Sequence, residues 1–470
     1  MRKKVTQPIN KILVQRADRM GDVILALPVI ERLRVAYPDA QIDFLTSSLG
    51  AKVVDGHPHI SQVKVVGGFF DTLSWMLGRR YDLFISLWSL GTYALLGWLA
   101  RIPRRIGDGS NPLLAWMYTD KLLIPWANFS RHQVQFNLDH LQSLGLSDEP
   151  WITTMYPKSD LVEQVQIDYA TSIENGQKIV FIFTDTGGSN LPIPESVLVA
   201  FVEQLCASGN FSVWIAYGQT RFPQLEQLSL KNLTNITTFI SLDKLIAYIS
   251  KAHVYIGPDT GPTHVASFLN IPLVYVTARK TNAPTKWGPL SDQFRIVRQE
   301  YTCPVFCSKM PCDQTRCLSY LSADLLMSEF ISLMHQVESN SVYSDADKLV
   351  CLQKHTWRVA AVFQSEADYQ LVRPVIDRLC REGLIVFPLL LSKTRPIYSF
   401  RAMLAICKFK NVTIFHGEWI PKWAYYCIRF LMGVIYLHYK PVWVRSSLSS
   451  TWSVHQFLEC YSNRWNQEIW

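Results

Sequence analysis

Short apolar runs alternate with helix-period segments along most of the chain, and this alternation restricts the fold more than any other sequence feature. A first series predicts strands at 11–14, 41–46, 63–66 and 83–87, with a helix at 23–37. A second series predicts strands at 178–184, 211–217 and 272–277, with helices at 195–207, 244–250 and 262–269. Strands that alternate with helices in this way form parallel sheets with crossover helices. We therefore predict an α/β protein with two doubly wound domains in tandem.

The length of the chain also favours several domains, because 470 residues exceed what one hydrophobic core usually organises. We predict a first domain at 1–170, a second at 171–337 and a polar linker at 338–350. Residues 351–470 repeat the strand–helix alternation over a shorter stretch, and we expect a small C-terminal α/β extension there.

The net charge of +8 is concentrated near the C-terminus, where residues 345–470 hold sixteen Lys and Arg against nine Asp and Glu. Such a balance suits an anionic membrane surface or nucleic acid. No nucleic-acid-binding motif accompanies it, so we expect a membrane-facing role and no nucleic-acid partner. The sequence contains neither an apolar run of spanning length nor a signal-peptide core. We expect a cytoplasmic protein, peripheral to the inner face of the inner membrane.

The segment at 419–443 is rich in Trp and Tyr and has cationic flanks. One interpretation is a helix that lies in a membrane interface, since aromatic residues with basic neighbours favour that position. The other is a buried helix that packs the extension against the rest of the protein, with its aromatic residues as core.

Four cysteines lie within fifteen residues, at Cys303, Cys307, Cys312 and Cys317. They could bind zinc, but their spacing lacks the CxxC pairs of common structural sites. We interpret them as reduced structural thiols and predict no metal.

The stretch "YIGPDTGPTHVASFL" ends a predicted strand with a Gly-Pro turn and begins a helix near Pro262. Helix N-termini at the carboxyl edge of a parallel sheet bind phosphate through free backbone N–H groups and the helix dipole. Asp259 could accept hydrogen bonds from sugar hydroxyls, and His264 could reach phosphate oxygens. The alternative is an ordinary strand–helix turn with Asp259 as its cap.

The stretch "RADRMGDVILALPVIERLR" places Gly21-Asp22 where the first strand gives way to a helix. Gly21 permits the close approach of a ligand, and Asp22 stands at a helix N-terminus. An acidic helix cap alone would also explain this carboxylate.

Together these two stretches resemble glycosyltransferase family 9, the ADP-heptose:lipopolysaccharide heptosyltransferases. "RRIGD" at 104–108, "NLDHLQSLGL" at 137–146 and "KWGP" at 286–289 fit the same family in order and spacing, over about residues 10–335.

The resemblance implies a GT-B fold, in which two Rossmann-like domains face each other across a cleft. The first domain would bind the acceptor, with Gly21 on its side of the site, and the second the nucleotide-sugar donor. The resemblance also implies metal-independent transfer with inversion and the aspartate of the Gly-Asp pair, here Asp22, as general base. Asp259, Thr260, Gly261 and His264 would hold the donor.

This chain departs from the family after the first strand of its second domain. The family usually has a phosphate-binding lysine there, whereas this sequence reads Ser189-Asn190-Leu191-Pro192. Thr184, Lys280 and Lys286 are candidate donor contacts in compensation.

The resemblance thus implies transfer of a heptose or related sugar from a nucleotide donor, ADP-heptose or another, to a lipopolysaccharide core acceptor, with no cofactor. The rival hypothesis is a weak or inactive scaffold protein on the same fold in envelope polysaccharide assembly. A nicotinamide-dependent dehydrogenase is disfavoured, because no GxGxxG follows the first strand.

Overall fold

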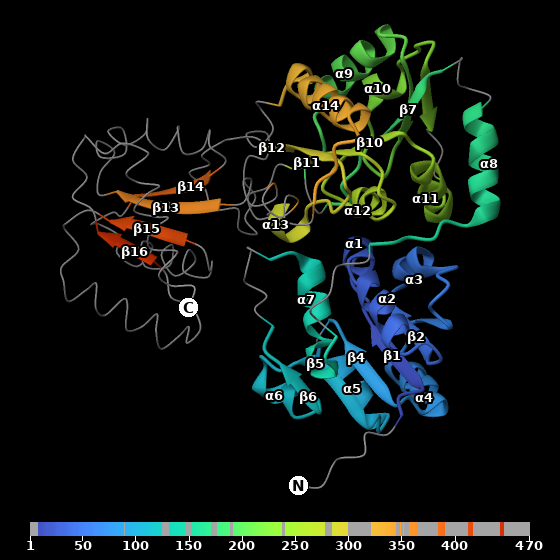
Figure 1. Ribbon diagram of the computed structural model, residues 1–470, viewed down its shortest axis with the longest axis vertical. Helices are drawn as coiled ribbons and strands as arrows, with labels where there is room; N and C mark the ends of the chain where they lie inside the picture. Colours follow the sequence, from blue (N-terminus) through green and yellow to red (C-terminus); the bar gives the residue numbers. More distant parts are fainter. Residues whose placement is uncertain are drawn as a thin grey trace.

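The computed structural model describes residues 8–88, 90–124, 131–146, 153–170, 176–188, 191–236, 240–277, 284–298 and 321–344, single residues 348 and 351, and the backbone of four strands between 357 and 445. Two lobes lie one above the other, with α1 of the lower lobe directly beneath α12 of the upper one (Figure 1). The cysteine cluster, Lys280 and residues 417–441 lie outside the described residues.

The first lobe is a six-stranded parallel sheet in the order β3-β2-β1-β4-β5-β6, with helices on both faces. Its elements are β1 (Lys11–Gln15), α1 (Met20–Ile24), α2 (Leu27–Ala36), β2 (Gln41–Thr46), α3 (Ser48–Val54), β3 (Gln62–Val65), α4 (Phe69–Arg79), β4 (Leu83–Ser86), α5 (Gly91–Leu99), β5 (Arg104–Asp108), α6 (Pro112–Ala115), β6 (Asp120–Leu122), α7 (Gln133–Asp139) and the 3-10 turn η1 (Gln142–Leu144).

The second lobe has a sheet of the same size and direction, in the order β12-β11-β10-β7-β8-β9. Its elements are β7 (Lys178–Phe183), α9 (Glu195–Ala207), β8 (Phe211–Ala216), α10 (Pro223–Glu226), β9 (Leu233–Ile236), α11 (Leu242–Ser250), β10 (Val254–Pro258), α12 (Gly261–Phe268), β11 (Leu273–Thr277), α13 (Pro284–Trp287), β12 (Phe294–Arg298) and α14 (Ala323–Glu338).

The helix α8 (Ser159–Ala170) precedes the second sheet and packs against α11, so it belongs structurally with the second lobe. The Tyr169 hydroxyl donates to the Tyr248 carbonyl at 3.0 Å, and its ring meets Trp214 edge-on with centroids 4.5 Å apart. The chain therefore crosses between the lobes at residues 153–158, before α8.

A third sheet, in the order β14-β13-β15-β16, is also parallel throughout. It consists of β13 (Trp357–Phe363), β14 (Leu384–Leu390), β15 (Val412–His416) and β16 (Val442–Arg445). The α/β class and the two opposed parallel sheets predicted from the sequence are thus confirmed.

The helix predicted at 23–37 is two helices, with a break at Leu25-Ala26. Pro28 is the reason, because it lacks an N–H and is accommodated in the first turn of a helix but not in its interior. The break lets α1 turn its N-terminus towards the second lobe while α2 covers the sheet.

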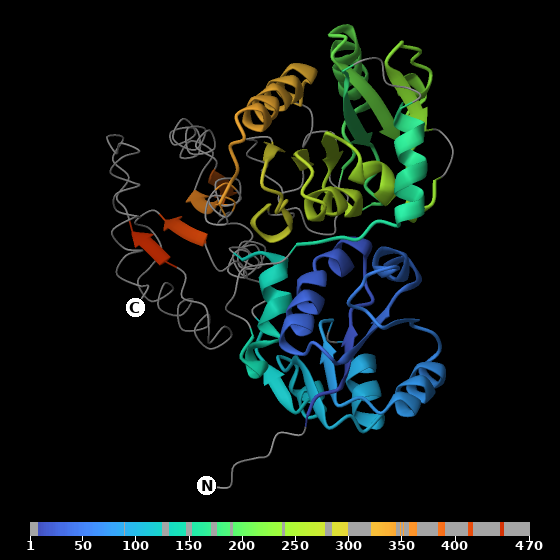
Figure 2. The same ribbon diagram turned by 45° about the vertical axis from the view of Figure 1, so that its right-hand side comes forward.

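The two lobes touch through short contacts between α1 and α12. A Cβ on Gly21 would lie 2.8 Å from His264 Cδ2, and one on Gly261 would lie 2.5 Å from Met20 Cε. Real Cβ atoms do not approach neighbours this closely, so a side chain at Gly21 would clash with the His264 ring. At Gly261 the flexible end of Met20 would have to move. Figure 2 shows the two lobes after a turn of the molecule, with α1 still directly below the second lobe.

Polar contacts join the lobes on either side of α1 and α12. His132, at the N-cap of α7, lies with its Nε2 3.0 Å from the Gly288 carbonyl oxygen of the second lobe. Lys158 bridges Asp55 of the first lobe at 2.6 Å and Asp243 of the second at 2.8 Å. No helix among the described residues is long and apolar enough to cross a bilayer.

Burial fixes the protonation of three histidines at or near this interface. It lowers the pKa of His132 and His140 to about 4, although hydrogen bonds to backbone carbonyls oppose the shift in both. Burial, with the nearby charge of His132, lowers the pKa of His264 to about 3. All three imidazoles are therefore neutral in the folded protein near pH 7.

Acidification should destabilise the protein between about pH 6.5 and pH 4. Unfolded histidine takes up a proton below about pH 6.5, whereas these buried rings do not. The unfolded state therefore binds more protons in this window, and the free energy of unfolding decreases as the pH is lowered. Each histidine contributes about 1.4 kcal/mol per pH unit in this window. Denaturant titrations at several pH values measure the slope.

His140→Gln should reduce that slope by about one histidine's share, because it removes one titrating group. The fold should be kept, since glutamine can still donate to the backbone carbonyls that bind Nδ1. His335→Gln is the matched control, since that side chain is 77% exposed. An unchanged slope in His140→Gln would contradict the assignment.

Candidate active site

Both sheets reverse their strand order at the edge where the lobes meet, between β1 and β4 in the first and between β7 and β10 in the second. Doubly wound sheets bind ligands outside the carboxyl ends of the strands at such switch points. The segments that follow β1, β7 and β10 therefore mark the expected site on both lobes.

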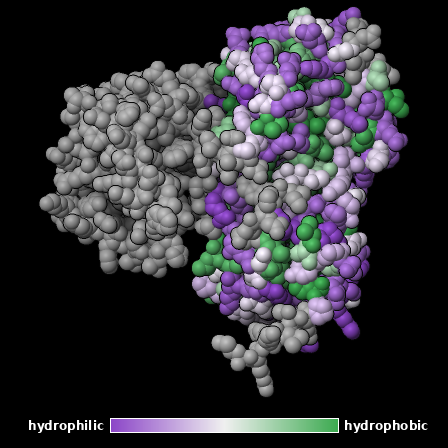
Figure 3. All heavy atoms as spheres, in the orientation of Figure 1, coloured by the Kyte–Doolittle hydropathy of each residue, from purple (hydrophilic) through white to green (hydrophobic). Residues whose placement is uncertain are grey.

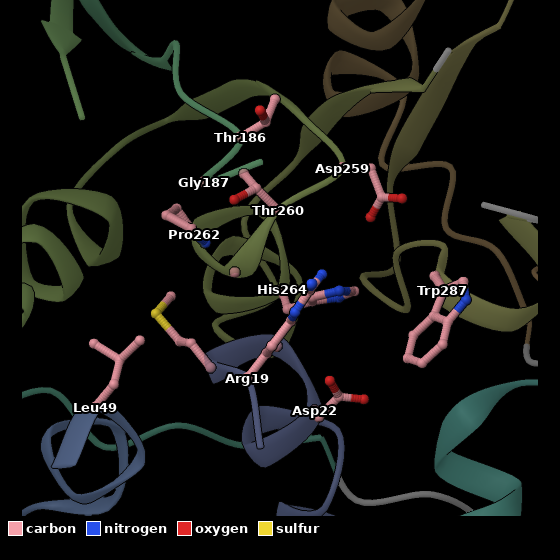
Figure 4. Close-up of a pocket in the computed structure, with 13 residues that line it drawn as sticks. Arg19, Asp22, Leu49, Thr186, Gly187, Asp259, Thr260, Pro262, His264 and Trp287 are labelled. Carbon is pink, nitrogen blue, oxygen red and sulfur yellow. The ribbon is translucent and has the colours of Figure 1, made fainter. Parts of the chain in front are cut away.

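A cavity of about 540 Å³ occupies this position and is lined by both lobes. Its lining residues are Arg19, Met20, Gly21, Asp22 and Leu49 from the first lobe, and Thr186, Gly187, Asp259, Thr260, Gly261, Pro262, His264 and Trp287 from the second. Figure 4 shows Asp22 below the space and Asp259 above it, with Arg19 extending from α1 beside His264. The structure thus brings together Gly21, Asp22 and the Asp-Thr-Gly-x-x-His segment that the sequence singled out.

Asp22 lies in the first turn of α1 with its side chain 17% exposed. Its Oδ1 accepts a hydrogen bond from the Arg16 guanidinium at 2.9 Å. Arg16 is itself buried and also donates to the Leu87 carbonyl at 2.9 Å and to Asp18 at 2.8 Å. Because Arg16 is held from several sides, it fixes the orientation of the Asp22 carboxylate at the cavity wall.

Asp18 shares the same guanidinium, at 2.7 Å from Arg16 Nη2. Burial raises the pKa of Asp18 to about 6; Arg16 opposes this shift, and the charge of Asp22 adds to it. Two carboxylates, Asp18 and Asp22, therefore share one buried guanidinium.

His264 presents a neutral imidazole to the cavity, because its pKa is far below its ordinary value. It cannot supply a positive charge to a phosphate near pH 7, although it can form a neutral hydrogen bond. The N-terminus of α12, with Pro262 in its first turn, provides the positive end of a helix dipole at the same wall.

The loop after β7 reaches the cavity through Thr186 and Gly187, and Asp185 holds it in place. The Asp185 carboxylate accepts hydrogen bonds from the backbone N–H groups of Gln219 at 2.7 Å and Thr186 at 2.8 Å, and from Thr220 Oγ1 at 2.7 Å. Burial would raise the pKa of Asp185, but these hydrogen bonds outweigh it and lower the pKa below its ordinary value. An ionised Asp185 therefore ties the β7 loop to the β8 loop.

Thr184 and Lys286, two predicted donor contacts, do not line the cavity. Thr184 is fully buried under the loop, two residues before the lining residue Thr186. Lys286 is buried with its Nζ 5.4 Å from the ring centroids of Phe136 and Trp287, where it joins α13 to α7.

Arg19 is a charged site residue that the sequence did not predict, and Leu49, Thr186 and Trp287 of the lining were not predicted either. Among the described lining residues Arg19 is the one Lys or Arg, and its side chain is exposed to the cavity. Its position three residues before Asp22, at the N-cap of α1, was the available signal. The same lining contains no group of His, Cys, Asp and Glu with metal-binding geometry among the described residues.

Comparison with known proteins identifies the family. The model of glycosyltransferase family 9 (heptosyltransferase) matches residues 73–316, which is just over half of the chain. The lipopolysaccharide heptosyltransferase 3 of Escherichia coli is 25% identical over 279 residues, which cover 54% of this chain and 79% of that protein.

Two solved structures share the fold. The glycosyl transferase family 9 protein of Veillonella parvula superposes with a TM-score of 0.59 at 19% identity, over 70% of this chain and 97% of that one. The ADP-heptose lipopolysaccharide heptosyltransferase II of Escherichia coli gives a TM-score of 0.56 at 19% identity, over 70% and 99%. With the GT-B arrangement and the family match both in place, the chain belongs to glycosyltransferase family 9 and is a glycosyltransferase of the heptosyltransferase family.

Proposed function

We propose that this enzyme transfers a heptose, or a related sugar, from a nucleotide-sugar donor to a lipopolysaccharide core acceptor, with inversion at the anomeric carbon. The observation that carries the proposal is that Asp22 of the first lobe and Asp259, Thr260, Gly261 and His264 of the second line one cavity. ADP-heptose is the proposed donor, in line with the names of the lipopolysaccharide heptosyltransferases that the chain resembles.

In this proposal the first domain, predicted at 1–170, takes the acceptor and the second, predicted at 171–337, takes the donor, with α8 counted in the second because it packs there. Residues 338–350 would link these domains to the extension at 351–470. The donor diphosphate would lie at the start of α12, where the helix dipole favours negative charge. Thr186 and Gly187 replace Thr184 in the donor set, because they line the cavity and Thr184 does not.

The reaction needs a base and a stabilised leaving group. The Oδ2 oxygen of Asp22 would take the proton from the acceptor hydroxyl as that oxygen attacks the anomeric carbon. The bond from this carbon to the diphosphate oxygen breaks on the opposite face, and its electron pair leaves with the diphosphate. Arg16 holds Oδ1 at 2.9 Å, which would direct Oδ2 towards the acceptor.

Asp22→Asn should lower kcat by about 10²- to 10⁴-fold, the usual contribution of a general base. The affinity for the nucleotide should stay within about threefold, because Asp22 is on the wall opposite the donor. Transfer from ADP-heptose to isolated lipopolysaccharide core, followed by mass spectrometry, gives kcat, and titration calorimetry with ADP gives the affinity.

Asp39→Asn serves as control, because that carboxylate is exposed and outside the cavity lining. Undiminished turnover of Asp22→Asn would remove Asp22 from the mechanism. Absence of nucleotide-sugar binding by the unmodified protein would instead favour the scaffold hypothesis.

Arg19 is the proposed substitute for the phosphate-binding lysine that this sequence lacks. Arginine pairs well with phosphate oxygens, and α1 extends Arg19 towards the second lobe (Figure 4). The neutral His264 cannot take over this charge.

Arg19→Ala should weaken ADP binding by about tenfold, which corresponds to one charge-assisted hydrogen bond of about 1.4 kcal/mol. Arg19→Lys should recover part of the loss, since it keeps the charge. Titration calorimetry measures both, with Arg221→Ala as control because Arg221 is 77% exposed and pairs with Glu226. Equal ADP affinity in Arg19→Ala and the unmodified enzyme would refute this role.

A further inference from the structure

The first lobe exposes a group of large apolar side chains along α5, α6 and the segment after β6. The exposed fractions are 42% for Leu90, 41% for Trp98, 80% for Leu113, 53% for Trp116 and 69% for Leu123. We refer to these five residues as the α5–α6 surface. Large apolar groups gathered on one exposed surface usually mark a contact with another molecule or a membrane.

These side chains form an outer layer that the core does not use. Beneath them, Ala94, Met117 and Tyr118 form a small buried cluster of their own, against which Leu95 and Leu114 pack. That cluster already joins α5 to α6, so the exposed residues are not required to hold the two helices together. Trp98 and Trp116 lie edge to face with centroids 5.2 Å apart, which makes the surface continuous from one helix to the next.

The segment that carries the α5–α6 surface has a positive net charge. Residues 90–124, all of which the structure describes, hold four arginines and lysines and two aspartates. Asp120 is paired with Arg104 at 3.1 Å, and the buried Asp108 accepts from Ser110 at 2.9 Å. Arg101 and Lys121 remain exposed at the border of the surface, so an anionic partner would meet cations without an opposing exposed carboxylate from this segment.

The α5–α6 surface extends to the sheet edge that faces the second lobe. Leu90 is the N-cap of α5, just after the carboxyl end of β4, and a Cβ on the adjacent Gly91 would lie 3.2 Å from Leu114 of α6. The surface therefore runs along the first lobe from the cleft side towards the far end of α5, where Arg101 lies. Figure 1 shows α5 and α6 on the lower lobe, and Figure 3 shows hydrophobic residues between hydrophilic ones on this lobe.

We propose that the α5–α6 surface docks the enzyme on an anionic lipid bilayer. Trp and Leu side chains would enter the interfacial region while Arg101 and Lys121 contact lipid phosphates, which is how peripheral proteins combine apolar insertion with charge. A bilayer suits scattered aromatic and aliphatic side chains with a cationic border, since it needs no matching shape. The inference rests on the proposed function, because the core acceptor is attached to a lipid and the proposed acceptor lobe carries this surface.

Vesicle sedimentation of the full chain tests the proposal. The unmodified protein should partition onto vesicles that contain phosphatidylglycerol, less onto pure phosphatidylcholine, and less when salt is raised. The double variant Leu113→Asp/Trp116→Asp should bind the anionic vesicles at least about tenfold more weakly, because it puts two charges into the inserted layer.

Ile167→Asp on α8 is the matched control, with an exposed fraction of 65% but outside the α5–α6 surface, and it should bind vesicles as the unmodified protein does. Circular dichroism and ADP titration of the double variant confirm that it is folded and keeps its donor site. Equal vesicle binding by the double variant and by Ile167→Asp would overturn the proposal, as would failure of the unmodified protein to bind.

The vesicle measurement uses neither donor nor acceptor, so it separates the two proposals. Loss of vesicle binding in the double variant supports the docking surface even if no heptose transfer is found. Transfer to delipidated core by a protein that does not bind vesicles would support the proposed function and refute the docking surface.

Discussion

The close packing of α1 against α12 is the constraint on which the site depends. Each helix begins at the carboxyl edge of its own sheet, and each contributes a glycine that lies against a side chain of the other lobe. A side chain at Gly21 would clash with the His264 ring of the other lobe, and one at Gly261 would displace the end of Met20. The same contact sets the separation between Asp22 and the start of α12. The geometry of the site therefore depends on how the two lobes pack.

The charges around the cavity follow from what burial permits. A buried guanidinium needs several partners, and Arg16 finds two carboxylates and a carbonyl. His264 is kept neutral by burial, which leaves Arg19 and the α12 dipole as the positive elements of the described lining. The proposed base, Asp22, is thus tied to a buried cation on the first lobe. The proposed phosphate contact, Arg19, comes from an exposed and more adaptable side chain next to it.

Much of this architecture was predictable because parallel sheets leave a strong sequence pattern. Buried strands such as 178–183 are continuous apolar runs, and helix 195–207 has one apolar face, so both were located within a residue. Less apolar edge strands, such as β6, β9 and β3, gave weaker signals, and β6 and β9 were not predicted. Gly107 in "RRIGD" was interpreted only as part of a family motif, but the structure gives it a packing role: a Cβ there would lie 2.3 Å from the Tyr118 ring.

Periodicity and turn chemistry are local properties, and they were enough to establish the α/β class, the two sheets and the residues at the carboxyl ends of β1 and β10. Which side chains share a cavity was settled only by how the lobes fold together. In the folded chain Thr186 lines the cavity and Thr184 does not, because the loop held by Asp185 brings the later residue to the cavity wall. Lys286 packs against Phe136 instead of lining the cavity. The folded chain also brought Arg19 to the cavity wall. These outcomes depend on how one lobe packs on the other, and contacts between residues more than a hundred positions apart leave no local pattern in the sequence.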